Sequence, residues 1–478
     1  MVLFKFAGYS HGAKVPAQRP RGVVRRDDGG AGALTHHRRM TQNPQPRVTW
    51  RTHLSLALLA LVYIFSFIDR QVVAVLIEPI KREFGVGDTA IGLLTGLAFG
   101  VLYAALGIPV GRLADRGNRR NIVAVCCGLW SLATIACGMV VQFWQLLLAR
   151  MSVAVGEAGG MAPSIALLSD LYPKERRALA IGVFMMGSNL GLLLGLALGG
   201  WIAQHYGWRT TFITFGLPGL VLALLVRLLV HEPRRGGFEL AQPVAPAAIR
   251  EPRLAQVRRL LAMPSLRNVA LACGVGGVAA YGYGIWVPSF LVRSHGMSIA
   301  HAGLLFGLAS GGGAMAGALF GGWLCDRLAQ RDARWQIGLP LLGALLSVPA
   351  ALAFLLWPAA DFWQLGTLRV PHAMVFALLF GFFAAWWPAL SYNAVSQMVT
   401  ASERTVAAAV LNLFITLLGV GLGPLVTGFF SDLLAPVYGA EALRWSLAAV
   451  CCLFLGTVFF FSLALKTYGP RLRALAVA

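Results

Sequence analysis

Residues 111–120 read GRLADRGNRR and join two long apolar runs, and their first six positions are echoed by GWLCDR at residues 322–327. In both copies a glycine is followed four residues later by Asp-Arg. Each copy closes an apolar stretch of about twenty residues, the length that crosses a bilayer as a helix. Each therefore marks a point where a helix leaves the membrane and the chain turns back. The repetition predicts a duplicated membrane protein.

The composition of the whole chain agrees with this prediction. Of its residues 58% are hydrophobic and 12% charged, and the mean hydropathy is +0.70, far from the balance of soluble domains. We predict an all-α polytopic membrane protein with twelve transmembrane helices in two six-helix bundles. The predicted spans lie near residues 54–77, 90–111, 121–143, 144–171, 178–203, 210–230, 267–292, 299–325, 337–357, 371–399, 405–432 and 443–465.

The predicted bundles are bordered by basic, proline-rich segments. Residues 1–50 are rich in Arg, Pro and Gly and are expected to be a disordered tail. Translation from Met1 and translation from Met40 both fit, and in the second case residues 1–39 are not translated. The predicted domains are the tail at 1–50, an N-terminal bundle at 51–230, a cytoplasmic linker at 231–265, a C-terminal bundle at 266–468 and a cytoplasmic tail at 469–478.

The basic residues behind the net charge of +21 are concentrated in alternate loops. With both termini in the cytoplasm, the N-terminal tail, the even-numbered loops and the C-terminal tail hold 31 of the 40 Lys and Arg residues, against 6 in the odd-numbered loops. This is the positive-inside pattern, so the basic charge indicates topology and contact with membrane lipids. It argues against a nucleic-acid partner. We expect a multi-pass protein of the bacterial inner membrane.

Four ionisable residues interrupt the first-half spans: Asp69, Arg70, Arg150 and Glu157. A charge at the centre of a bilayer costs about 2.5–3.5 kcal/mol even on insertion scales, so these groups must face a cavity or each other. The rise of a helix places Asp69 and Arg150 at similar depth and Glu157 about 10 Å deeper. We expect Arg150 to neutralise Asp69 and Glu157 to carry a proton. The alternative is a static ion-pair cluster that locks two helices together.

The second half offers uncharged polar groups among aromatic side chains. A cavity between an ionic half and an aromatic half suits an amphiphile, with its charged head toward Arg70 and Arg150. The alternative is that the aromatic stripe is an ordinary packing or lipid-facing surface. The cavity candidates are Tyr281, Tyr283, Trp386, Trp387, Tyr392, Asn393 and Asn412.

The repeated loop also predicts a conformational switch. An aspartate at a helix end accepts hydrogen bonds from the N-terminal amides of another helix and from arginine, which would close the cytoplasmic side. Asp115 is the first candidate for this role. The alternative is that the arginines of this loop only set topology. The switch candidates are Gly111, Asp115, Arg116, Asn118, Arg119, Asp326 and Arg327.

No cofactor site is predicted. The seven cysteines lie in or at the ends of apolar spans without metal-ligand spacing, and no lysine lies in a phosphate-binding loop. We therefore expect no metal, no ATP-driven step and no enzyme activity. The proton is the expected coupling ion.

The loop at 111–120 resembles the signature of the major facilitator superfamily, Gly-x-Leu-Ala-Asp-Arg-x-Gly-Arg-Lys/Arg, and the six-span duplication is similar to that fold over residues 50–468. Asn118 stands where the superfamily usually has glycine, a position that asparagine fills when the backbone turns left-handed. Spinster-like transporters share this Asp-Arg-x-Asn-Arg form. Segments 67–70 (FIDR), 156–158 (GEA), 231–233 (HEP) and 286–291 (WVPSFL) resemble that branch too.

The resemblance implies a proton-coupled secondary active transporter. Such a carrier moves lysophospholipids or sphingoid lipid phosphates by alternating access, with the four buried charges at the coupling site. At residues 159–160 two glycines replace a Ser-Tyr pair of animal relatives, so another substrate is compatible. A proton-driven carrier of a small organic anion or drug stays open as the alternative, and a non-transporting membrane sensor is the distant one. We expect a monomer.

Overall fold

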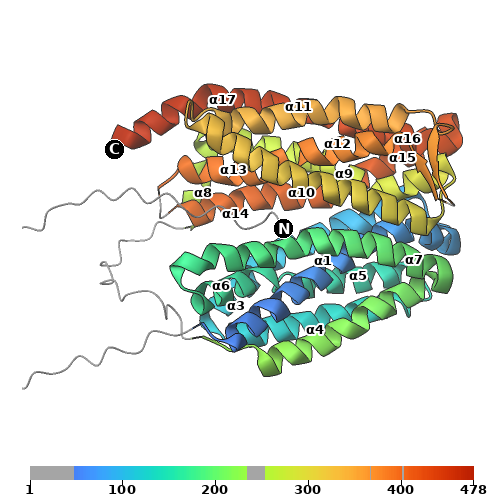
Figure 1. Ribbon diagram of the computed structural model, residues 1–478, viewed down its shortest axis with the longest axis horizontal. Coiled ribbons are helices and arrows are strands. Elements are labelled where there is room, and N and C mark those ends of the chain that lie inside the picture. Colours follow the sequence, from blue (N-terminus) through green and yellow to red (C-terminus); the bar gives the residue numbers. More distant parts are fainter. Residues whose placement is uncertain (1–47, 234–252, 367, 401–402, 478) are drawn as a thin grey trace, which may run out of the picture. The chain divides into compact units, whose positions relative to one another are not determined.

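The computed structural model describes residues 48–233, 253–366, 368–400 and 403–477. Residues 1–47 of the predicted tail, its two possible start sites and most of the predicted linker therefore lie outside the described residues. Residues 46–478 form one compact unit. In Figure 1 the helices of the first half lie together in one layer and those of the second half in another.

The first half consists of helices that follow one another with short turns. They are α1 (Trp50–Phe84), α2 (Asp88–Gly92), the π-helix η1 (Leu93–Leu97), α3 (Ala98–Arg116), α4 (Arg119–Cys137), α5 (Phe143–Glu157), α6 (Met161–Leu171) and α7 (Lys174–Leu229). The second half repeats the pattern. It contains α9 (Pro264–His295), α10 (Ile299–Ala329), α11 (Trp335–Leu356), α12 (Met374–Ala384), α13 (Trp386–Gln397), α14 (Arg404–Phe414), the π-helix η2 (Ile415–Leu422), α15 (Gly423–Tyr438), the 3-10 turn η3 (Gly439–Glu441), α16 (Ala442–Cys451) and α17 (Leu453–Val477).

Ten helical runs within the described residues are long and apolar enough to cross a membrane. Two of these runs, 174–229 and 404–473, contain a residue outside helical geometry. Gly207 has φ 84° and ψ 162°, and Gly439 has φ 51°. A side chain at Gly207 would be strained in this backbone conformation, so glycine permits the chain to turn there. Division at both glycines gives the twelve segments that the sequence predicts.

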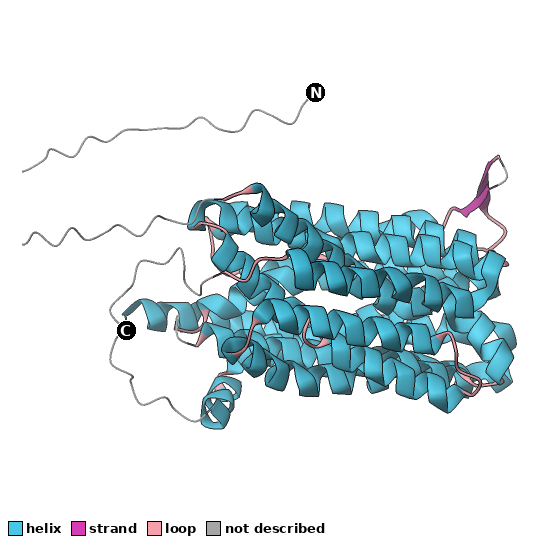
Figure 2. Ribbon diagram, turned by 90° about the horizontal axis from the view of Figure 1, so that it is seen from below, coloured by secondary structure: helices cyan, strands magenta, loops and turns pink. Residues whose placement is uncertain are grey.

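The helices have two ends, which we name by the turns that lie there. The linker side carries the turns at residues 117–118, 172–173 and 330–334 and the two described ends of the linker. The far side carries the turns at 85–87, 138–142 and 296–298. It also carries an antiparallel hairpin of β1 (Phe362–Leu365) and β2 (Leu368–Pro371), which projects from the helices in Figure 2. The hairpin is an addition to the predicted all-α fold.

The predicted linker contains a helix, α8 (Arg253–Ala262), that the sequence analysis did not anticipate. Leu260 is fully buried, whereas Leu254 is 82% exposed. Arg259 forms an ion pair with Glu403, which precedes α14. Burial acts to raise the pKa of the Glu403 carboxyl, but hydrogen bonds from Arg259 and Thr400 hold that pKa below its usual value. The ion pair ties α8 to the second half.

The repeated loop has a different geometry from the predicted one. Asn118 has φ −78° and ψ 111°, so its backbone is extended and the prediction of a left-handed turn is wrong. Asn118 instead caps α4, because its side-chain oxygen accepts a hydrogen bond of 2.9 Å from the Asn121 amide. An asparagine in this place is thus explained by its capping oxygen and needs no special backbone.

Glu232 completes this cap from the described start of the linker. Its two carboxylate oxygens accept hydrogen bonds from the backbone amides of Arg119, at 3.0 Å, and Arg120, at 2.8 Å. These amides are among the donors that the first turn of a helix leaves unpaired, and a carboxylate there also faces the positive end of the helix dipole. Glu232 therefore fixes the end of the first half onto the repeated loop.

Replacement of Glu232 by alanine is expected to cost about 1 kcal/mol, the usual loss for a helix cap. Thermal unfolding of the purified protein in detergent should show a lower Tm. Glu232→Gln is the matched control, because its amide oxygen still accepts one bond, and its Tm should lie between those of the wild type and of Glu232→Ala. An alanine variant with wild-type Tm would contradict the capping role.

Candidate functional site

The two halves touch each other along the far side. A Cβ on Gly96 would meet the carbonyl of Gly421, and one on Gly100 would lie 2.9 Å from the Cα of Gly421, so η1 and α3 pack against η2 without intervening side chains. On the other flank α7 packs against α10, where a Cβ on Gly200 would lie 2.8 Å from the Ile299 carbonyl. Toward the linker side this packing ends: Gly107 has open space around its Cβ position. The space between the halves is thus closed on the far side.

An ion network across the two halves accompanies this contact. Arg293 of α9 donates to both carboxylate oxygens of Asp88, at 2.7 and 2.8 Å, and to Glu78 at 2.8 Å. Lys81 also pairs with Asp88, and the Ser431 hydroxyl donates to it at 2.6 Å. Asp88 is 3% exposed. We call Glu78, Lys81, Asp88, Arg293 and Ser431 the far-side network.

Asp432 supports this network from α15. Its carboxylate accepts bonds from the backbone amides of Asp88, at 2.9 Å, and Thr89, at 2.7 Å, and from the Thr89 hydroxyl at 2.7 Å. The first turn of α2 is therefore capped by a residue of the other half. These residues were not predicted from the sequence. The signal was present, because Asp432 stands near the end of an apolar span, where an acid needs a partner.

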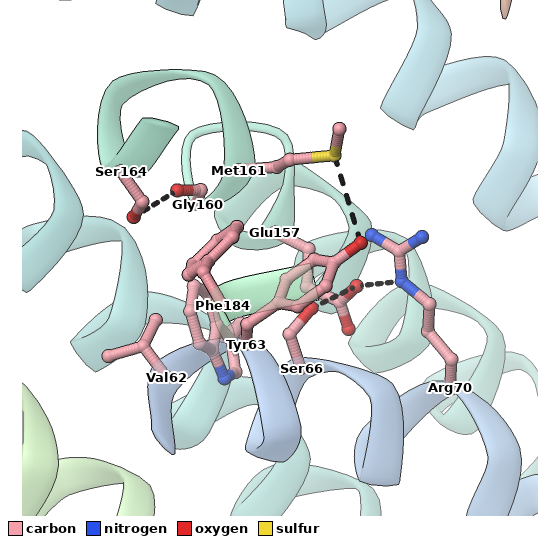
Figure 3. Close-up of a pocket in the computed structure, with 10 residues that line it drawn as sticks. Val62, Tyr63, Ser66, Arg70, Glu157, Gly160, Met161, Ser164 and Phe184 are labelled. Atoms are coloured by element: carbon pink, nitrogen blue, oxygen red, sulfur yellow. Dashed lines mark hydrogen bonds and ion pairs between the residues drawn. The ribbon is translucent and has the colours of Figure 1, made fainter. Parts of the chain in front are cut away.

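The buried charges of the first half meet beside α1, but in a different pairing from the predicted one. Glu157 is 1% exposed and forms an ion pair with Arg70, and the Ser66 hydroxyl donates to the same oxygen, Oε2, at 3.2 Å. Figure 3 shows Ser66 and Arg70 converging on that oxygen. Arg70 retains 24% exposure of its side chain. The glutamate is therefore sealed in the half, while its partner reaches the surface between the halves.

Asp69 and Arg150 lie together without the predicted carboxylate–guanidinium pair. Arg150 donates from Nη1 to the main-chain carbonyl of Asp69 at 3.1 Å, and the Asp69 carboxylate accepts a 3.1 Å bond from Thr134 of α4. Both residues are buried. The predicted ion pair between the Asp69 carboxylate and Arg150 is therefore wrong. Asp69 and Arg70 are neighbours on α1, and about 100° separates their side chains. Asp69 accordingly faces α4, whereas Arg70 faces the second half.

Aromatic rings surround the Arg70 guanidinium. Its carbon lies 5.4 Å from the ring centre of Phe67, 5.3 Å from Phe99 and 4.5 Å from Tyr103, distances at which rings attract a cation. Arg150 lies over the same Phe99 ring at 5.7 Å. Phe99 and Tyr103 were not predicted from the sequence. Their spacing of four residues puts both on one face of a helix, which was the available signal.

Close backbone packing places Glu157 at the end of α5. A Cβ on Gly156 would lie 2.6 Å from the backbone nitrogen of Trp130, and one on Gly159 would meet the Cys126 sulfur. Larger residues at these two positions would push α5 away from α4. The glycine at 159 is thus required by the packing.

The cavity candidates of the second half fall into two groups: residues that face the first half and residues that are buried within the second half. Tyr281 is 37% exposed and lies close enough to Arg70 for their charges to interact, so it faces the first half. The Tyr392 hydroxyl donates to Asn412 at 3.2 Å, and Asn393 is exposed. Tyr283, two residues from Tyr281 and hence on the opposite helix face, is 1% exposed among the rings of Phe306, Phe354 and Phe380.

The two tryptophans of the predicted aromatic surface are packing residues. Trp386 and Trp387 are 4% and 3% exposed. Trp386 packs against Phe382 and Phe383 and fills the space beside Gly343. The stripe is therefore a packing surface at Trp386 and Trp387. The prediction that these two residues and Tyr283 line a cavity is wrong, because all three side chains are buried.

The switch candidates lie on the linker side. The side chain of Asp115 is outside the described residues. Arg116 and Asp326 are exposed, Arg327 lies over the Trp323 ring at 5.6 Å, and Arg119 pairs with Asp170 of α6. Gly111 has open space around its Cβ position. The switch role stays a prediction.

The described residues hold no group of three or more His, Cys, Asp or Glu side chains that could bind a metal ion. The groups that this site brings together are two carboxylates, two guanidiniums and several hydroxyls. They can bind an anion and exchange a proton, and they include no activated nucleophile.

Comparison with known proteins agrees with the fold. The sequence profile of the Major Facilitator Superfamily matches residues 59–370. An MFS-type efflux pump of Mycolicibacterium smegmatis is 35% identical over 399 residues, which cover 83% of this chain and 88% of the pump. The sphingosine-1-phosphate transporter SPNS2 of Danio rerio is 26% identical over 436 residues, which cover 86% of this chain and 84% of that protein.

Among solved structures, a bacterial homolog of the human lysosomal transporter Spinster superposes with a TM-score of 0.77 at 28% identity. The superposition covers 88% of this chain and 98% of that one, which is in an inward-facing and unoccupied conformation.

This chain therefore belongs to the Major Facilitator Superfamily, as an integral multi-pass membrane protein. Within the superfamily it falls in the spinster-like branch. The predicted fold class and family are thereby confirmed, and so is the prediction of a transport protein that is not an enzyme.

Proposed function

We propose that this protein is a proton-coupled secondary active transporter that moves an amphiphilic lipid with an anionic head group by alternating access. A lysophospholipid or a sphingoid phosphate is the substrate class that fits best. The likeness to SPNS2 supports a lipid of this kind. The likeness to a Spinster homolog in an inward-facing conformation supports alternating access.

One observation carries the proposal: a partly exposed arginine is bound to a fully buried glutamate. Arg70 reaches the space between the halves, whereas Glu157 does not. An anionic head group that binds Arg70 competes with Glu157 for the same guanidinium. A glutamate that loses its partner in an apolar interior is left as an isolated charge, which is so costly that the group takes up a proton instead. Anion binding at Arg70 thereby favours proton binding at Glu157.

The second half supplies a less polar wall. Its fully buried charged side chains, within the described residues, are limited to Glu403 at the linker side. Tyr281 faces Arg70, and the Tyr392–Asn412 pair adds hydroxyl and amide groups. Such a wall offers hydrogen bonds without charge, which suits the glycerol or amino-alcohol part of a lipid. The ionic contact is left to the first half.

The membrane orientation follows from the positive-inside pattern. We place the linker side and both termini in the cytoplasm of a bacterial inner membrane. The closed far side then faces outward, and the space between the halves opens inward. Membrane lipids are the expected surroundings and the protein is expected to work as a monomer, with the proton as its only coupling ion.

A second substrate class has its own support, because the efflux pump of Mycolicibacterium smegmatis is 35% identical to this chain. In this alternative Arg70 binds the carboxylate of a small organic anion or drug. The competition between anion and Glu157 would be the same, and only the size and apolar character of the substrate would differ.

Reconstituted protein tests both proposals. Proteoliposomes with an imposed pH gradient should accumulate or release a fluorescent sphingoid phosphate or lysophospholipid, and a protonophore should abolish the flux. Small carboxylates and drug-like dyes form the comparison set, and protein-free liposomes are the control. Gradient-dependent flux of small solutes alone would favour the alternative. Binding without flux of any compound would contradict transport and favour a sensor.

A further inference from the structure

A small cavity lies beside Glu157 and is lined by residues of the first half alone. It is lined by residues of α1, α4, α5, α6 and α7, and it holds about 250 Å³ of empty space, part of which is open to the outside. Its solvent-accessible core is about the size that one water molecule needs. Figure 3 shows this cavity with Glu157, Ser66 and Ser164 on its wall.

Two buried polar atoms of the cavity wall have no hydrogen-bond partner in the described part of the chain. They are Oε1 of Glu157 and Nε1 of Trp130, on side chains that are 1% and 0% exposed. The two bonds described above both end on the other oxygen, Oε2. Unpaired buried groups of this kind are rare, because each costs about 1–3 kcal/mol.

The chemistry of the two atoms is complementary but needs an intermediary. The indole N–H can only donate, and a carboxylate oxygen can only accept. A water molecule accepts from Trp130 with its oxygen and donates one hydrogen to Glu157. Its second hydrogen has an acceptor in Ser164, whose hydroxyl donates to the Gly160 carbonyl at 2.7 Å and keeps its lone pairs free. Three partners are the usual number for a buried water.

We propose that this cavity is a hydration site through which Glu157 receives its proton on Oε1 while Arg70 remains bound to Oε2. The inference rests on the proposed function. A hydronium ion that reaches the site gives one proton to Oε1, so that a neutral carboxyl group and a neutral water remain. The proton therefore arrives without first displacing Arg70. Its arrival neutralises the carboxylate, so that only a hydrogen bond from Arg70 remains, which the anionic substrate then replaces.

Tyr63 and Met161 meet on the wall of the cavity. The Tyr63 hydroxyl lies 3.9 Å from the Met161 sulfur, and the Tyr63 ring stacks on Phe184 with centroids 4.5 Å apart. Met161 is 39% exposed. Figure 3 shows the contact between these two side chains at the edge of the cavity. In this proposal protons enter past Met161, the exposed side chain of the wall.

The charged and titratable groups around Glu157 are few. Arg70, Asp69 and Tyr63 come from α1, and Arg150 comes from α5 itself. Cys126 comes from α4, where its sulfur packs near Gly159. The described parts of α6 and α7 that line the cavity add Met161, Ser164 and Phe184, none of which titrates. A change confined to Trp130 leaves all these groups in place.

Hydroxyl-radical labelling of the detergent-purified protein tests the hydration site without any transport assay. A bound water allows radicals to oxidise an indole that bulk solvent does not reach. Trp130 should therefore be labelled severalfold faster than Trp286, which is equally buried but donates its N–H to the Pro424 carbonyl at 2.9 Å. Equal, slow labelling of both would overturn the proposal.

A cavity-filling variant sharpens this test. Gly160 has helical backbone angles, φ −82° and ψ −54°, and a Cβ there would lie 3.4 Å from the Trp130 ring. Gly160→Ala should fold normally and place a methyl group in the cavity. We expect labelling of Trp130 to fall severalfold toward that of Trp286. Undiminished labelling would count against water in this cavity.

The role in proton delivery is tested by Trp130→Phe, which keeps an aromatic ring, although a smaller one, and removes the donor. A donor bonded through water stabilises the charged carboxylate, so its loss should favour protonation. The midpoint of the pH profile of gradient-driven flux should move upward by about 0.5–1 pH unit. Trp357→Phe is the matched control, because this indole N–H also lacks a partner but belongs to the second half.

The outcomes separate the two proposals. An unshifted midpoint in Trp130→Phe, with Trp130 labelled in the wild type, would show that water occupies the cavity but does not serve Glu157, and would overturn the inference. Absence of any flux in the wild type would instead contradict the proposed transport function, while the labelling experiment would still decide whether the cavity binds water.

Discussion

Replacement of Glu157 by glutamine should reduce proton-driven flux to the level of protein-free liposomes. Glutamine keeps the shape and the hydrogen bond from Ser66, but it neither binds a transportable proton nor forms an ion pair with Arg70. Reconstituted Glu157→Gln protein, assayed under an imposed pH gradient, gives the direct measurement. Wild-type flux in this variant would overturn the coupling role and leave the four charges as a static lock between helices.

The same variant should bind the anion more tightly. Glu157 and the head group compete for one guanidinium, and a hydrogen bond to a charged group is worth about 1.5–3 kcal/mol. Removal of the competitor should therefore increase affinity roughly tenfold or more. Equilibrium binding in detergent checks this. Glu175→Gln makes the same chemical change at an exposed position near the start of α7 and should leave flux and affinity unchanged.

Replacement of Arg293 by methionine should open the far side. In the closed conformation Arg293 is shared by Asp88 and Glu78, which belong to the other half, so its loss leaves two carboxylates facing each other with Lys81 as the remaining cation. Removal of one partner of a buried ion pair costs about 3–5 kcal/mol. This cost falls on the closed conformation alone, because the pairing joins the two halves.

Distances between spin labels provide the measurement for Arg293→Met. Met139 and Val437 are 70% and 77% exposed and lie on the far side of different halves, so cysteines introduced there can be labelled. The distance distribution should move to longer values than in the wild type. Arg209→Met is the matched control, because Arg209 pairs with Glu83 within the first half. Equal distributions in all three proteins would show that the far-side network does not hold the halves together.

Much of the fold could be predicted because a bilayer sets the length of each span. The twelve apolar runs correspond to helical segments, and most of their ends lie within a few residues of the prediction. The exceptions include α1 and α17, which continue to Phe84 and Val477, beyond the predicted ends at 77 and 465. The two glycines outside helical geometry explain why two pairs of spans appear as continuous runs. Helix α8 escaped prediction because its ten residues are too few to span a bilayer and follow a proline-rich stretch. The hairpin at 362–371 escaped because the pairing of two short strands leaves no strong local pattern.

The candidate site was predictable in its members but not in their contacts. A charge within an apolar run is visible in any sequence, and depth along a helix correctly brought Asp69 and Arg150 to the same level. The partner of each charged side chain depends on how its helix is rotated about its own axis, which the sequence does not reveal. In the structure this rotation brings Arg70 to Glu157. Rotation also separates Tyr281 from Tyr283. For Trp386 and Trp387, hydrophobicity could not distinguish a cavity wall from a packed interior.

The four interior charges of the first half have a consequence for the response to membrane voltage. Asp69, Arg70, Arg150 and Glu157 sum to zero, so an empty carrier that reorients moves no net charge through the electric field. One monovalent anion taken up together with one proton leaves that sum unchanged. A doubly charged phosphate monoester with one proton adds a single negative charge, which 100 mV would favour or oppose by about 2.3 kcal/mol. The valence of the cargo, more than the protein, thus sets whether transport generates current.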